Sequence, residues 1–128
     1  MRRKYVVLSL CLAVSLAAYV RSARSGPAPT NWEKTRSDAV QKAYTLHRAQ
    51  LDSGLSKPEQ VYLWSARWVD AEGAKAAAVD AHLDRMKSLE LAVDKQVKAG
   101  LLSAADASAA TYYRAEAELW SARAHGAK

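Results

Sequence analysis

The sequence predicts an all-α protein built from antiparallel helical hairpins, and three observations support this. Half of the 128 residues are hydrophobic, yet the chain has no Phe, five Gly and three Pro. Such a composition is poor in strand formers and turn residues, so it favours helices over sandwiches or barrels. Apolar residues also recur at helical spacing. Finally, the pattern breaks at Gly54 and Gly100, each followed by signals that begin a new helix.

Residues 1–21 have the pattern of a secretory signal peptide. Met1–Lys4 is a basic head, Tyr5–Val20 carries no charge, and the small residues Ser15 and Ala17 fit a cleavage site. The alternative is an uncleaved anchor, although a spanning helix needs about 20 apolar residues and this run is shorter. We expect an exported protein, periplasmic or extracellular, that contacts a membrane only through this segment if it is not cleaved.

The net charge of +6 also belongs mainly to the leader. Of the 19 basic residues five lie in the first 24 positions, which leaves 14 against 13 acidic residues in the body. We therefore expect no nucleic-acid partner. Cys11, the single cysteine, lies in the leader as well, so a cleaved chain has no disulfide and no thiol chemistry.

Residues 22–31 are rich in Ser, Gly and Pro, which predicts a flexible linker, and 32–128 form the helical domain. The first helix is expected over about 32–53, with Val40 and His47 on the stripe that faces a partner helix.

Two junctions should reverse the chain. At each, a glycine suits the left-handed residue that ends a helix, and a serine followed three residues later by an acid predicts a capping box. The junctions are Gly54 with Ser56 and Glu59, and Gly100 with Ser103 and Asp106. Their offset of 46 residues also aligns Gln50 with Gln96, which suggests a duplicated hairpin.

Between the junctions, only Gly73 interrupts the helical pattern. Apolar positions keep one register from Val61 to Val93 across it, with His82 and Met86 on the same stripe, and no capping residue follows the glycine. We therefore expect one long central helix and three helices in total. A break near Gly73, which would give a four-helix bundle, is the alternative.

The last helix, over about 104–124, shows Ala110, Tyr113, Ala117 and Trp120 at helical spacing. Alanine at such positions lets two helices approach closely, and aromatic rings fill the remaining gaps.

The sequence carries no nucleophile motif, phosphate-binding loop or dinucleotide fingerprint, so we expect no enzyme, no catalytic residues and no cofactor. His47 and His82 fall on different helices and His125 in a frayed tail, so no metal site is predicted. The candidates for protein contact are the two tips and the larger aromatic residues. They are Leu55, Ser56, Leu101, Ser103, Trp64, Trp68, Tyr112, Tyr113 and Trp120.

The run Gly100-x-x-Ser103-x-x-Asp106, followed by Ala110, resembles the helix–turn–helix tip pattern of TolC-type outer-membrane efflux proteins. The resemblance implies a hairpin of that style, without the barrel and without a channel. A weaker similarity links Leu55-Ser56-Lys57-Pro58-Glu59-Gln60 to the Leu-Thr-x-x-Gln motif of Spy/CpxP-type periplasmic chaperones, which are small exported helical proteins.

These observations lead to a first hypothesis, an exported non-enzymatic coiled-coil protein that binds a protein partner or itself in the cell envelope. The alternatives are a periplasmic chaperone or stress-sensor subunit that holds unfolded chains on its aromatic surface, and a metal sensor that uses His47 and His82.

Overall fold

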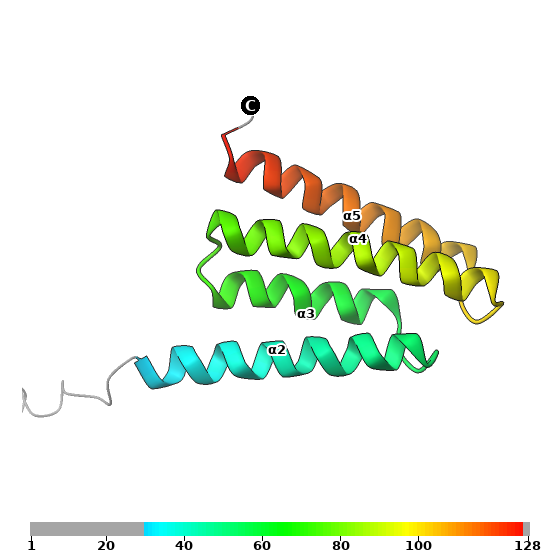
Figure 1. Cartoon of the computed structure of the whole chain (residues 1–128), viewed down its shortest axis with the longest axis horizontal. Helices are drawn as coiled ribbons and strands as arrows, with labels where there is room; N and C mark the ends of the chain where they lie inside the picture. Colours follow the sequence, from blue (N-terminus) through cyan, green and yellow to red (C-terminus); the bar gives the residue numbers. More distant parts are fainter. Residues whose placement is uncertain (1–29, 127–128) are drawn as a thin grey trace, which may run out of the picture. The chain divides into compact units, whose positions relative to one another are not determined.

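The computed structural model describes residues 30–126, so the leader and most of the linker lie outside the described residues. By its packing the chain separates into Met1–Trp32 and Glu33–Lys128, and the description below concerns the second unit. The helices are α2 (Thr30–Asp52), α3 (Pro58–Ala71), α4 (Ala76–Lys98) and α5 (Ala104–Ala124). Consecutive helices run antiparallel (Figure 1), so the predicted all-α fold of helical hairpins is confirmed.

The expected long central helix is wrong, because the chain reverses at Gly73. There Gly73 and Ala74 both adopt left-handed backbone, with φ of +74° and +51°, which an α-helix cannot contain. The N–H of Ala74 donates to the carbonyl of Val69 at 2.9 Å, and that of Gly73 to Asp70 at 3.1 Å. The glycine itself ends α3, although no side-chain cap begins α4.

The same helix-ending motif closes the two predicted junctions. The glycines at the three corners have φ of +70° at Gly54, +74° at Gly73 and +75° at Gly100. The N–H of Leu55 donates to the carbonyl of Gln50 at 2.7 Å, and that of Leu101 to Gln96 at 2.9 Å. These are the hydrogen bonds of the Schellman motif, so both predicted corners are confirmed and the equivalence of Gln50 and Gln96 is structural.

The two predicted capping boxes differ in outcome. At α5, Ser103 Oγ accepts a hydrogen bond from the Asp106 N–H at 3.2 Å, and Asp106 accepts one from the Ser103 N–H at 2.9 Å. At α3 the box at Ser56 and Glu59 is wrong, because Lys57 is the N-cap residue and makes no side-chain cap. Ser103 follows its glycine by three residues and Ser56 by two, so Ser56 stands one position too early to cap.

The core runs along α4. Its fully buried members come from all four helices and are Leu51, Val61, Met86, Leu89, Val93, Ala110 and Ala117. The most extensive packing is between α4 and α5, where the two alanines have no exposed surface and let the backbones approach. The register predicted for α4 is therefore confirmed. In α3 the buried stripe is Val61, Ser65 and Val69, and the tryptophans flank it.

Among residues 30–126 there is no helix long and apolar enough to cross a membrane.

Candidate functional site

The Gly54 and Gly100 corners lie at the same end of the bundle (Figure 1), because α2 and α4 end there and α3 and α5 begin there. A groove of about 340 Å³ lies between them and is lined by residues of both corners. Among the lining residues are His47, Leu55, Ser56, Lys57, Leu101 and Leu102. We call the two corners and this groove the corner surface.

The corner surface is marked by two exposed leucines. Leu55 is 80% exposed and Leu101 is 60% exposed, although each follows a helix-ending glycine. In a Schellman motif this residue often packs back on the last turn of the helix, but the residues at that place here are Gln50 and Gln96. The structure therefore brings Leu55, Ser56 and Leu101 of the predicted contact residues to one groove.

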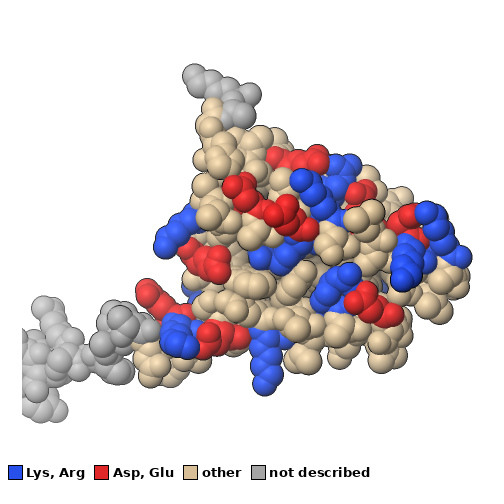
Figure 2. Space-filling model, in the orientation of Figure 1, with Lys and Arg blue, Asp and Glu red and all other residues tan. Residues whose placement is uncertain are grey.

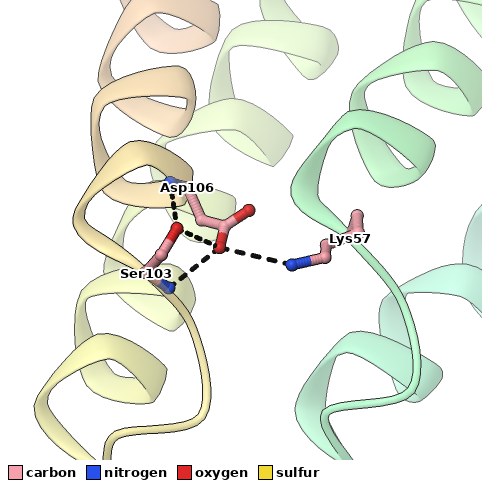
Figure 3. A network of polar contacts seen from close by, with 3 residues as sticks. All are labelled: Lys57, Ser103 and Asp106. Atoms are coloured by element: carbon pink, nitrogen blue, oxygen red, sulfur yellow. Dashed lines mark hydrogen bonds and ion pairs between the residues drawn. The ribbon is translucent and has the colours of Figure 1, made fainter.

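A polar network ties the two corners together (Figure 3). Asp106 accepts hydrogen bonds from the hydroxyl of Ser103 at 2.7 Å and from its backbone N–H, and the Lys57 ammonium lies 3.5 Å from the same carboxylate oxygen. The hydrogen bonds from Ser103, assisted by the charge of Lys57, hold the pKa of Asp106 below its usual range. Because Lys57 is largely exposed, the ion pair contributes little stability and chiefly neutralises the only charge that lines the groove.

Ser56 lines the groove and does not cap α3. Its hydroxyl lies 3.4 Å from Nδ1 of His47, whose ring stacks on Trp64 with centroids 6.2 Å apart. The Ser56 side chain thus connects the Gly54 corner to His47 of α2.

Three aromatic candidates in α5 divide into two packed rings and one exposed ring. Tyr113 stacks on Tyr62 with centroids 4.2 Å apart, and Trp120 stacks on His82 at 5.1 Å. Both are half-buried and pack between helices. Tyr112 is 61% exposed and meets Tyr113 edge to face.

The α3 tryptophans are also half-buried. Trp68 donates to the Glu72 carboxylate at 2.7 Å, and the Arg85 guanidinium lies 4.2 Å from its ring centroid. Trp64 lies under the Arg67 guanidinium at 4.6 Å. The Arg85 contact joins α4 to α3, whereas the Arg67 contact lies within α3. Because their rings are half-buried, the aromatic candidates other than Tyr112 contribute mainly to packing.

A buried polar network escaped the sequence analysis. Arg85 donates to Ser65 Oγ at 2.7 Å, and this oxygen lies 2.8 Å from Nδ1 of His82. An arginine can only donate, so the Ser65 hydroxyl is free to donate to Nδ1, which leaves the proton of the imidazole on Nε2. That atom is buried without a partner among residues 30–126. Ser65 and His82 face each other only because the chain reverses at Gly73.

This serine–histidine pair resembles a nucleophile with its base, but both side chains have no exposed surface. Burial, with the nearby charge of Arg85 as a smaller cause, lowers the pKa of His82 to about 4. The imidazole is therefore neutral at pH 7 and acts as a packed polar core residue.

The histidines do not converge on a metal site. In the part of the chain that the structure describes, no group of three or more His, Cys, Asp and Glu side chains could hold an ion. The prediction that His125 lies in a frayed tail is wrong. His125 is the C-cap residue of α5, and its Nε2 lies 2.9 Å from the Asp80 carboxylate. Ser121 donates to the same carboxylate at 2.7 Å.

Charges of both signs are spread over the face of the molecule seen in Figure 2. Many of them pair along one helix or between helices, as Glu90 does with Arg114 at 2.7 Å.

The fold and site together define an antiparallel four-helix bundle with two exposed leucines beside a groove at one end. No model of a known family matches the chain, and neither a curated protein nor a solved structure shows significant similarity to it.

Proposed function

We propose that this chain is an exported, non-enzymatic helical protein that works in the cell envelope by protein–protein contact. Export is inferred from the leader pattern of residues 1–21, which lie outside the described residues. The non-enzymatic role is inferred from a sequence without a catalytic motif, and the burial of Ser65 and His82 agrees with it.

The observation that carries the proposal is the exposure of Leu55 and Leu101 on either side of one groove. Exposed apolar side chains that gather at one place, rather than singly, mark contact surfaces. A second copy of the chain fits this surface best. A two-fold contact needs a self-complementary patch, and this one supplies both the projecting leucines and the groove that could receive them. Its one lining charge, Lys57, is already paired with Asp106.

The test is sedimentation equilibrium of the purified protein over a wide concentration range. The wild type should show a reversible dimer, and the Leu55→Ser/Leu101→Ser double variant should stay monomeric at concentrations at least tenfold higher. Leu91→Ser is the matched control, since Leu91 is 74% exposed on α4 but does not line the groove. A wild type that is monomeric throughout, or a control that dissociates as much as the double variant, would refute self-association through this surface.

A chaperone is the second candidate, favoured by the exposure of Leu91, Tyr112 and Leu119 outside the corner surface. It predicts that the monomer suppresses the aggregation of reduced insulin at near-equal molar amounts, and that Tyr112→Ser weakens this effect. A protein without effect at tenfold excess would exclude it.

A further inference from the structure

A second groove lies on the side of the bundle, between α2 and α3. Its volume is about 360 Å³, within the range of about 300 to 1,000 Å³ that is usual for small-molecule sites. Ala39 and Val40 of α2 line it together with Trp64 of α3, and Arg36 and Arg67 complete it. The groove shares no lining residue with the corner surface, so it is a separate candidate.

The groove exists because α2 packs less closely than the other helices do. α4 and α5 approach through alanines, whereas α2 contacts its neighbours through large side chains such as Tyr44, which lies 5.7 Å from Trp68 between ring centroids. Such contacts keep the backbones apart and leave space beside them. The lining is largely apolar, with Val40 buried and Trp64 half-buried.

The charge of the groove has one sign. Arg36 contributes from α2 and Arg67 from α3, and no acidic residue is among the lining residues. Neither arginine forms an ion pair with any carboxylate of residues 30–126, whereas Arg48 and Arg114 both do. Arg67 instead lies over the Trp64 ring, which orients the guanidinium without neutralising it. Two uncompensated positive charges therefore border an apolar floor.

We propose that this groove binds a small organic anion with an apolar body. A carboxylate or sulfonate group would pair with Arg36 and Arg67, whose planar donors match such groups, and the apolar part would pack on Val40 and Trp64. The ligand class is thus an amphipathic acid, whose charged end pairs with the arginines and whose apolar end is buried against the groove.

The test compares two fluorescent probes that differ in one charged group, 8-anilinonaphthalene-1-sulfonate and the uncharged N-phenyl-1-naphthylamine. The wild type should bind the sulfonate at least tenfold more tightly than the neutral probe, and decanoate should displace it. In Arg36→Gln/Arg67→Gln, the sulfonate should bind no better than the neutral probe, whose own affinity stays within twofold. Both substituted arginines are exposed, so the variant should keep the wild-type melting temperature.

Lys42→Gln is the matched control, because Lys42 is exposed on α2, forms no ion pair with another described residue and does not line the groove. It should leave the preference for the sulfonate unchanged. The proposal is overturned if the wild type binds both probes equally, or if the double arginine variant keeps the preference. It is also overturned if Lys42→Gln lowers the affinity for the sulfonate as much as Arg67→Gln does, since the attraction would then be unspecific.

Discussion

The two ends of the bundle share the same helix-ending hydrogen bonds but present different side chains. At the Gly54 and Gly100 corners the residue after the glycine is a leucine, exposed in both cases. At the Gly73 corner it is Ala74, and the nearby end of α5 is held by polar contacts of Asp80. Because Ala74 completes the same hydrogen bonds, the turn does not require leucine. The comparison teaches that Leu55 and Leu101 are not explained by folding alone.

The largest expected effect is a loss of stability at low pH, caused by His82 in the half of the bundle near Gly73. The pKa of His82 is about 4 when folded and 6.5 ordinarily, so the unfolded chain binds its proton first as pH falls. The free energy of unfolding should keep its full value above pH 6.5 and should fall by about 3 kcal/mol by pH 4. Urea unfolding at a series of pH values measures this loss.

The His82→Leu variant supplies the control for the acid effect, because it keeps the volume and removes the titrating group. The difference between the two pH profiles should account for most of the loss between pH 6.5 and 4. Parallel profiles would mean that the pKa of His82 is the same in the folded and the unfolded chain.

The next largest effect is expected when the glycines of the three corners are replaced, and it compares the cost of a side chain at each left-handed position. An added Cβ meets no atom within 4 Å at Gly54, Gly73 or Gly100, so only the left-handed φ is strained. Alanine at each position should lower the free energy of unfolding by about 1 kcal/mol, with similar values at both ends. Urea denaturation of the three variants checks this. A much larger loss at one corner would show that its glycine does more than end a helix.

A comparable effect separates the two corners that share an end. Ser103→Ala should cost about 1 kcal/mol because it removes a capping box, whereas Ser56→Ala should cost less than about 0.5 kcal/mol because Ser56 caps nothing. Thermal unfolding of both variants measures the difference. Equal losses would contradict the placement of the α3 N-terminus at Pro58.

The smallest effect on stability is expected for the corner leucines. Leu55→Ser/Leu101→Ser should change the free energy of unfolding by less than about 0.5 kcal/mol, since both side chains are mostly exposed. Urea denaturation at a concentration where the protein is monomeric measures it. A loss of about 2 kcal/mol or more would show that the leucines belong to the core.

The sequence predicts the helical class and two of the corners, because a helix-ending glycine is a local signal. The capping box of Ser103 and Asp106 is predictable for the same reason, since it lies within four consecutive residues. The sequence offers the break at Gly73 only as the alternative, because apolar spacing continues across it and the next helix begins without a side-chain cap. That spacing reflects burial in each helix separately, so it does not require one rod.

The sites depend on contacts that only the folded chain creates. The predicted tips meet because the third corner makes the chain reverse once more, which places α2, α3, α4 and α5 with two corners at one end. Ser65 and His82 pair across the same reversal. The groove between Arg36 and Arg67 depends on how far α2 stands from α3, and no spacing within one helix encodes that distance.

The most direct measurement compares the two ends in one chain type. A single cysteine is placed at Leu55 or at Ala74 in a Cys11→Ser chain, so that the introduced thiol is the only one. Treatment with a short bismaleimide should join Leu55→Cys molecules into covalent dimers at least tenfold faster than Ala74→Cys molecules, and Leu101→Ser should abolish that advantage. Equal rates at the two ends would contradict a contact surface at the Gly54 and Gly100 corners.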